Sequence, residues 1–199
     1  MTKKEIIWRE ILVQASEQKK NLFTQKELAG VLGVSLSTVF NALKIPRQAH
    51  MIDVSGRNFR LDSYHKLLLL WASHRVLQKD MLYTTRVDIA SKAIEALFPP
   101  SAQFGFYSAF AFSYQETPAD YDHVYVYGDS LMLPEIRNRF SIGDEKSKNP
   151  NVFLLKKDSR IAQLGHMPPE QIFVDIWNAP EWYAKDFLKS LEDKLSLHA

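Results

Sequence analysis

Apolar side chains recur at helical spacing near the start of the chain. Ile7, Trp8, Ile11, Leu12 and Ala15 lie three or four residues apart within residues 3–18. At 3.6 residues per turn, this spacing stacks them on one face of a helix, and that face must be buried. The pattern therefore predicts a first helix over residues 3–18 that packs against a core.

Helix-boundary signals predict two further helices between residues 24 and 46. Thr24-Gln-Lys-Glu27 forms a capping box, in which the Thr hydroxyl and the Glu carboxylate bond free N–H groups, and the helix is expected to run to about Leu32. Gly33 can adopt the positive φ that a reversing chain needs, and Ser35 can cap the next helix. Pro46 is expected to end that helix, because proline lacks a backbone N–H.

The third predicted helix separates apolar from polar side chains. Leu36, Val39, Phe40 and Leu43 follow an i, i+3, i+4, i+7 spacing and are expected to face inward. The same geometry turns the polar residues between them outward, namely Ser37, Thr38, Asn41 and Lys44. Two helices joined by a glycine turn, the second with a polar outer face, indicate a helix-turn-helix.

Residues 51–61 alternate in polarity around Gly56-Arg57 and predict a β-hairpin. A type II′ turn with Gly56 first pairs Ser55 with Asn58, Val54 with Phe59, Asp53 with Arg60 and Ile52 with Leu61. This register keeps the apolar pairs on one face and an opposite-charge pair on the other. A hairpin that directly follows a helix-turn-helix predicts a winged helix-turn-helix, with Arg57 at the tip of the wing.

The rest of the chain predicts a mixed α/β domain. Asp62 is expected to cap a helix that runs to about Leu77 and buries Leu67–Trp71, and a domain boundary is expected near residues 78–82. Phe104–Tyr114 fits either helix or strand. Short apolar runs predict buried strands at 124–127 and 152–155, and helices are expected at 87–97, 170–177 and 181–195, the last with Trp182 on its buried face. The predicted fold class is α+β, with domains at 1–78 and 79–199.

Composition limits the classes of protein that fit. The chain has 199 residues, 46% hydrophobic and 24% charged, which is typical of a packed protein. It has no cysteine, which excludes disulfides, thiol nucleophiles and cysteine zinc sites. The longest apolar run, Leu67–Ala72, falls far short of the roughly 20 residues of a membrane span, and no signal-peptide stretch is present. We therefore expect a cytoplasmic protein with no membrane partner.

Charge is unevenly distributed along the chain. Residues 1–70 carry 11 Lys/Arg and 6 Asp/Glu, a net charge of +5, whereas residues 71–199 carry 14 and 17, a net charge of −3. A cationic segment that also contains a helix-turn-helix pattern favours a partner rich in phosphate. We therefore expect double-stranded DNA as the partner, contacted by Ser35, Ser37, Thr38, Asn41, Lys44, Arg47, Arg57 and Arg60.

The chemistry of these side chains suits a DNA groove. Asn41 can make a bidentate contact to adenine, Ser and Thr can bond base edges or phosphate, and Lys and Arg neutralise phosphate. Two cations have structural alternatives, because Arg60 can pair with Asp53 across the hairpin and Arg47 can cap the last carbonyls of the third helix. A single helix contacts few base pairs, so a dimer, or several copies on repeated operator sites, is expected.

Several segments together resemble one protein family. They are the winged helix-turn-helix, the Asp62-led helix with Leu67–Ala72, the Tyr107–Phe112 segment before a strand, and the closing Pro169–Trp177 segment. This combination resembles the AbiEi-type antitoxins of type IV toxin–antitoxin systems. The resemblance implies a repressor of its own operator, a second domain with a nucleotidyltransferase-like scaffold, and a nucleotidyltransferase-like toxin as a partner.

Motifs for catalysis are missing from the sequence. A nucleotidyltransferase needs a Gly-Ser turn followed by paired carboxylates for Mg²⁺, and no such pair follows the nearest match, Gly128-Asp-Ser130. The six histidines, which include His198, lack metal-ligand spacing. We therefore expect no enzyme activity, cofactor or metal. Two alternatives stay open: a nucleotidyl-transferring enzyme that uses Asp120, Asp122 and Ser130, and a repressor that senses a ligand at Phe104–Tyr114.

Overall fold

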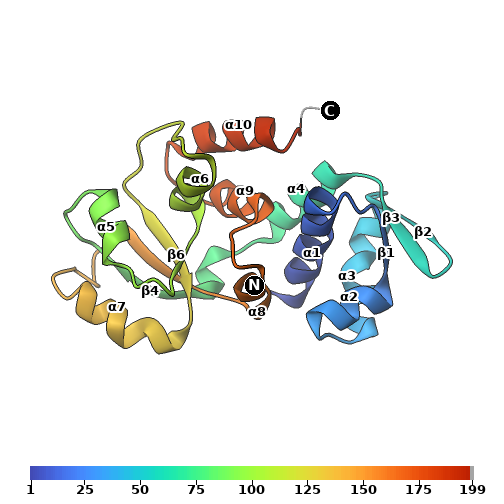
Figure 1. The fold of residues 1–199 in the computed structure, drawn as a ribbon, viewed down its shortest axis with the longest axis horizontal. Coiled ribbons are helices and arrows are strands. Elements are labelled where there is room, and N and C mark those ends of the chain that lie inside the picture. The colour runs from blue at the N-terminus through green and yellow to red at the C-terminus, as the bar shows by residue number, and fades with distance from the viewer. Residues whose placement is uncertain (198–199) are drawn as a thin grey trace. The chain divides into compact units, whose positions relative to one another are not determined.

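The computed structural model describes residues 1–197, so His198 lies outside the described residues. The chain divides into two compact units, Met1–Arg75 and the residues from Val76 onward (Figure 1). Each unit combines helices with a small sheet, so the fold class is α+β. The expected boundary after residue 78 falls inside the 3-10 turn η1 (Leu77–Asp80), just beyond this division. No single helix among residues 1–197 has the length and apolar composition needed to span a bilayer.

The first unit contains four helices and a three-stranded antiparallel sheet. In chain order the elements are α1 (Lys3–Glu17), β1 (Leu22–Thr24), α2 (Gln25–Leu32), α3 (Leu36–Gln48), β2 (Ile52–Ser55), β3 (Asn58–Leu61) and α4 (Tyr64–His74). The sheet has the order β1-β3-β2. The predicted apolar face of α1 is confirmed, since Ile7, Trp8, Ile11 and Leu12 are fully buried. The helix also buries polar residues that the pattern did not predict, among them Glu10 and Gln14, which share a hydrogen bond of 2.7 Å.

The hairpin forms in the predicted register. Ile52, Asp53, Val54 and Ser55 of β2 face Leu61, Arg60, Phe59 and Asn58 of β3. Gly56 has φ +60° and Arg57 has no positive φ, as a type II′ turn requires. Strand β1 was not predicted, because three residues are too few to show an alternating pattern. It places Phe23 opposite Phe59, with the two rings stacked at 5.5 Å between centroids.

Two expected helix caps differ in detail from the prediction. Thr24 accepts the Glu27 N–H as predicted, but the Glu27 carboxylate bonds the Lys20 ammonium instead of completing a capping box. A complete capping box is formed elsewhere, between Thr2 and Glu5 at the start of α1. The cap of α4 is Ser63 rather than Asp62, because the Asp62 carboxylate accepts a hydrogen bond from Arg60.

Pro46 lies inside α3 and does not end it, contrary to the prediction. A proline cannot donate to the carbonyl four residues earlier, which here belongs to Ala42. The indole N–H of Trp8 donates to that carbonyl at 2.9 Å. The carbonyl therefore keeps a buried partner, and α3 continues to Gln48.

The second unit contains a four-stranded mixed sheet with helices on both faces. Its remaining elements are β4 (Met81–Thr85), α5 (Ser91–Leu97), β5 (Gln103–Phe104), α6 (Phe106–Tyr114), β6 (Val124–Gly128), η2 (Ser130–Met132), α7 (Leu133–Arg139), β7 (Val152–Lys156), α8 (Ser159–Leu164), α9 (Pro169–Trp177) and α10 (Ala184–Lys194). The strand order is β4-β7-β6-β5, and only the central pair, β6 and β7, is parallel.

Helices cover both faces of the sheet in this unit (Figure 1), and alternating residues of β6 pack against one layer or the other. Val124 and Val126 join a buried cluster with Ile94 of α5 and Ile136 of α7. Between them, Tyr125 stacks on Phe106 of α6 at 3.9 Å, on the opposite face. Both predicted buried strands are thereby confirmed, since residues 124–127 and 152–155 are buried in a sheet that has both faces covered.

Other expectations for the second unit need correction. The helix expected at residues 87–97 begins only at Ser91, because the Asn151 side chain bonds both the N–H and the carbonyl of Val87 and holds that residue outside the helix. The Phe104–Tyr114 segment is both strand and helix, as β5 ends at Phe104 and α6 follows. Trp182 is 73% exposed, not buried, because it precedes the first turn of α10. The sequence analysis does not predict strand β4.

Candidate nucleic-acid interface

Helices α2 and α3 meet at a sharp turn. Their axes differ in direction by 120° across a break of three residues. Gly33 makes the turn at φ +61°, and the Ser35 hydroxyl accepts the Thr38 N–H at 3.2 Å to start α3. The predicted glycine turn and serine cap are confirmed, and together they fix the direction in which α3 leaves the turn.

The buried stripe of α3 is displaced from the predicted one. Val39, Ala42, Leu43 and Pro46 are buried, and they follow the same i, i+3, i+4, i+7 spacing. Leu36 and Phe40, which were expected inside, are 54% and 49% exposed. The two stripes share Val39 and Leu43. The prediction combined these two with Leu36 and Phe40, whereas in the structure they are buried together with Ala42 and Pro46. The exposed face of α3 is therefore more apolar than predicted.

The polar candidates on α3 fall into two groups. Near its start, Ser35 Oγ lies 2.9 Å from Ser37 Oγ and 2.8 Å from Thr38 Oγ1, so these three hydroxyls already bond one another. Farther along, within residues 1–197, Asn41 and Arg47 make no side-chain hydrogen bond or ion pair. Asn41 and Arg47 can therefore bond a ligand without breaking an existing hydrogen bond or ion pair.

The cations of α3 have no neutralising partner on the helix. Lys44 Nζ lies 5.5 Å from the centre of the Phe40 ring, a cation–π contact on the exposed face. Arg47 lies in the last turn of α3, where the structure as described shows no hydrogen bond from its guanidinium to the final carbonyls. The helix contains no Asp or Glu, so this face carries positive charge only.

The hairpin supplies one free arginine and one paired arginine. Arg57 is exposed at the tip and, among the residues described here, has no ion-pair partner. Arg60 faces Asp53 in the sheet register, but its Nε donates to Asp62 Oδ1 at 2.8 Å. The hydrogen bond and the charge of Asp62 raise the pKa of Arg60 above its ordinary value. The structural partner of Arg60 is therefore Asp62, not Asp53, and Arg57 is the cation that is available to a ligand.

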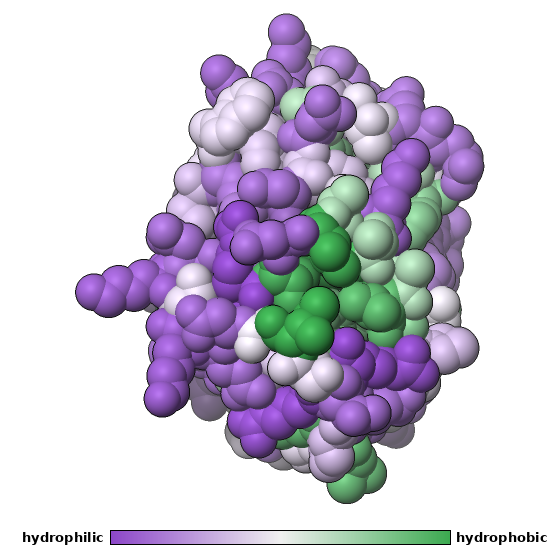
Figure 2. Space-filling model, turned by 90° about the vertical axis from the view of Figure 1, so that its left-hand side faces the viewer, coloured by the Kyte–Doolittle hydropathy of each residue, from purple (hydrophilic) through white to green (hydrophobic). Residues whose placement is uncertain are grey.

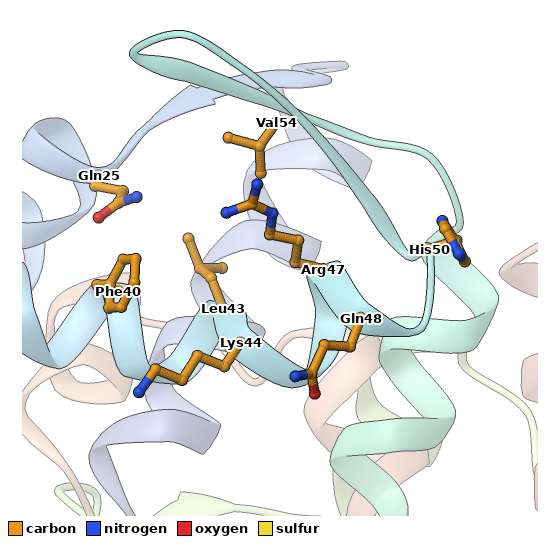
Figure 3. Close-up of a pocket in the computed structure, with 8 residues that line it drawn as sticks. All are labelled: Gln25, Phe40, Leu43, Lys44, Arg47, Gln48, His50 and Val54. Carbon is orange, nitrogen blue, oxygen red and sulfur yellow. The ribbon is translucent and has the colours of Figure 1, made fainter.

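A hollow of about 590 Å³ lies between α3, the start of α2 and the hairpin (Figure 3). Phe40, Leu43 and Arg47 of α3 point into it, toward Gln25 and the Val54 side chain of the hairpin. Lys44 and Gln48 also line it but extend along the outer side of α3, and His50 closes one end. Sequence reasoning missed Gln25, Gln48 and His50. These three residues are identified as part of the hollow only by their position beside residues 40–47 in the folded chain.

Asp122, one of the candidate catalytic residues, and Asp129, beside the candidate Ser130, make hydrogen bonds within the second unit. Asp129 caps η2 by accepting the N–H groups of Leu131 and Met132. Asp122 bonds His123 and the hydroxyl of Tyr183. Burial raises the pKa of Asp122, but the hydrogen bonds from His123 and Tyr183 outweigh this effect, so the pKa lies below its ordinary value. Among residues 1–197, no group of three or more His, Asp or Glu side chains is arranged to hold a metal ion.

The second unit has two further surface features, a hollow and an apolar patch. A hollow of about 620 Å³ is lined by Phe112, Tyr121, Lys92 and several carboxylates, including Glu95 and Asp120. Figure 2 faces the end of this unit that carries α5 and α7, and it shows hydrophobic side chains gathered in one patch there. Trp182 is exposed as well, whereas Tyr183 beside it is buried.

Comparisons of the chain with protein-family models, with curated proteins and with solved structures find no match.

Proposed function

We propose that the first unit is a winged helix-turn-helix domain that binds double-stranded DNA in a sequence-specific manner, and that the protein is a transcriptional regulator. One observation carries this proposal. The exposed face of α3 holds Asn41, Lys44 and Arg47 without a carboxylate, beside a hairpin with the free Arg57 at its tip. In this arrangement α3 is the recognition helix and the hairpin is the wing.

The dimensions of these elements support the proposal. An α-helix with its side chains is about 10–12 Å wide, and the major groove of B-DNA is about 12 Å wide. With α3 in that groove, the adjacent hairpin reaches the sugar-phosphate backbone or the next minor groove. The hollow between them then lies where a phosphodiester strand passes, and Arg47, which points into the hollow, supplies its positive charge.

The candidate residues take different roles in this complex. Asn41 contacts a base edge, because its amide offers both a donor and an acceptor, whereas Lys44, Arg47 and Arg57 contact phosphates. Ser35, Ser37 and Thr38 lie at the N-terminus of α3, where hydroxyls and backbone N–H groups can bond one phosphate. Arg60 has a weaker role, since Asp62 neutralises its charge.

A selection experiment tests the proposal. The full chain is incubated with random-sequence duplexes, and the bound fraction is sequenced over several rounds. We expect a repeated motif, bound with an affinity that falls as salt rises, because phosphate contacts release counterions. Lys44→Ala should flatten the slope of log affinity against log salt by about 1. Lys66→Ala, which removes an exposed lysine of α4, is the matched control and should leave the slope unchanged. Absence of DNA binding at low salt would refute the assignment.

The resemblance to AbiEi-type antitoxins extends the proposal to a cytoplasmic antitoxin that represses its own operator. Under this proposal, the gene next to this one encodes a nucleotidyltransferase-like toxin. Expression of that neighbour should arrest growth only when this chain is absent. Co-purification of the two proteins would show direct neutralisation, and rescue without co-purification would show an indirect route. A neighbour without any effect on growth would leave the DNA-binding function but remove the antitoxin role.

The hollow of the second unit favours a second candidate function, a regulator that senses a ligand. It is lined by Phe112 of the aromatic segment and by Tyr121, with charged groups at its rim. A small molecule bound there should raise the melting temperature of the protein. Phe112→Ala should abolish that rise, and operator affinity should change only in the protein with the intact site. A ligand that stabilises both proteins equally would argue against this site.

A further inference from the structure

The exposed face of α3 carries an apolar side chain that folding does not explain. The Phe40 ring is half exposed, although the same helix buries smaller residues at Ala42 and Pro46. Its visible contact is with Lys44, whose ammonium lies over the ring. Leu36, one helical turn before Phe40, is exposed as well, and contiguous exposed apolar side chains often mark binding sites. Phe40 lines the hollow beside the hairpin and directly precedes Asn41 in α3, so its ring lies within the proposed DNA interface.

The charges around Phe40 indicate what covers it. Lys44 and Arg47 stand on the same helix, Arg57 stands on the hairpin, and α3 bears no carboxylate. A partner must therefore bring an apolar group surrounded by negative charge. The major groove of DNA offers one such group, the 5-methyl of thymine, between two strands of phosphates. Phenylalanine is among the side chains that contact this methyl in protein–DNA complexes.

We propose that Phe40 is a specificity-determining residue that packs against the 5-methyl group of a thymine near the base that Asn41 contacts. This inference rests on the proposed DNA-binding function and adds a base preference to it. Asn41 selects adenine by hydrogen bonds, and Phe40 selects thymine by apolar contact. The operator is therefore expected to contain an A·T-rich step under the middle of α3.

A change in the DNA alone tests this contact. Each thymine of the selected duplex is replaced in turn by deoxyuridine, which lacks the methyl group but keeps every hydrogen-bonding atom. Affinity is measured by fluorescence anisotropy at constant salt. At one position the wild-type protein should bind about fourfold more weakly, the equivalent of ~0.8 kcal/mol for one buried methyl group. Because the protein is unchanged, this result does not depend on whether a variant folds.

Two variants assign the effect to the ring. Phe40→Ala should bind the thymine duplex about as weakly as the wild-type protein binds the uracil duplex, and it should lose sensitivity to uracil at that position. Leu36→Ala removes another exposed apolar side chain of α3 and should retain that sensitivity. Circular dichroism melting curves confirm that both variants are folded.

The outcomes separate the two proposals. Sequence-specific DNA binding with no thymine sensitive to uracil, or equal sensitivity in Phe40→Ala, would overturn the methyl contact and leave the DNA-binding function intact. Loss of self-association in Phe40→Ala, again without any uracil effect, would place the ring in a protein interface and also overturn it. No binding to any duplex would overturn both.

Discussion

Trp8 supplies a hydrogen bond that Pro46 cannot make. Pro46 leaves the Ala42 carbonyl without its helical donor, and the Trp8 indole N–H of α1 takes that place at 2.9 Å. Trp8 is fully buried, so it also contributes apolar packing between α1 and α3. The orientation of α3, and with it the exposed face that we assign to DNA, depends on this contact.

Removing the indole donor should therefore destabilise the protein. Trp8→Phe leaves the Ala42 carbonyl buried and unbonded, and it also loses packing volume, so we expect a loss of about 2–4 kcal/mol in the free energy of unfolding, measured by urea denaturation. In a Pro46→Ala background the helix regains its own N–H donor, and the loss should be smaller by about 1 kcal/mol. Equal losses in both backgrounds would show that the hydrogen bond contributes nothing.

Replacing Asn41 should remove much of the preference of the protein for its selected DNA sequence. Its amide has no partner within the described residues, so Asn41→Ala should not disturb the fold. We expect the variant to lose about 1–3 kcal/mol of binding free energy on the selected site and little on random DNA. Competition binding between the two DNAs measures the difference. A uniform loss on both would instead make Asn41 a phosphate contact.

Among the individual elements, the hairpin and α3 differ in how uniquely their own sequences determine which residues are buried. The hairpin has a unique register, because a shift by one residue would expose Phe59 and bury Arg60. Helix α3 has two stripes of equal spacing, and only packing against α1 and α2 selects the one through Ala42 and Pro46. A strand pair is therefore better defined by its own sequence than a short amphipathic helix.

Two glycines of the first unit should respond oppositely to substitution by alanine. Gly56 has φ +60° in the hairpin turn, so Gly56→Ala should cost about 1–2 kcal/mol of stability even though no atom lies within 4 Å of the added Cβ. Gly30 lies inside α2 with equally open space, and Gly30→Ala should add about 0.5–1 kcal/mol. Thermal melting of both variants makes the comparison. Destabilisation by both would mean that space, rather than backbone conformation, is limiting.

At the scale of the whole molecule, hydrogen bonds between tyrosines and carboxylates connect distant segments of the second unit. Tyr107 of α6 and Tyr125 of β6 both donate to Glu181, at 2.8 and 2.5 Å. Tyr183 donates to Asp122 at 2.9 Å. Burial first, and the neighbouring carboxylates second, raise the pKa values of Tyr107, Tyr125 and Tyr183 above the ordinary value for tyrosine. These segments are more than fifty residues apart, so no local pattern predicts the network.

Stability should consequently fall in alkaline solution. The folded state keeps these tyrosines protonated, whereas the unfolded chain releases their protons near pH 10. Their contribution is thus complete below pH 10 and is lost as the pH rises above it. Urea unfolding at pH 8 and pH 11 should show the decrease, and Tyr125→Phe should reduce it. Absorbance at 295 nm should show that only some of the eight tyrosines ionise before unfolding. A single transition near pH 10 for all eight would contradict this prediction.

Features with local physical causes could be predicted from the sequence. Gly33, Ser35 and Gly56 set their turns and cap through backbone conformation and near-neighbour bonds, and the runs at Val124 and Val152 became buried strands because of their own composition. The free cations and Asn41 were also accessible to sequence reasoning, because a helix has to expose most of its polar residues.

Features that depend on a partner far away in the sequence could not be predicted and are visible only in the folded protein. Pro46 continues its helix because Trp8 bonds Ala42, Asp62 gives up its cap because Arg60 binds it, and residues 87–90 stay outside α5 because Asn151 holds Val87. The exposure of Phe40 belongs to the same class, since packing of α3 chose one of two equivalent stripes. A polar group bonds a partner that the fold brings within hydrogen-bonding distance, and this distance cannot be calculated from the separation of the two residues in the sequence.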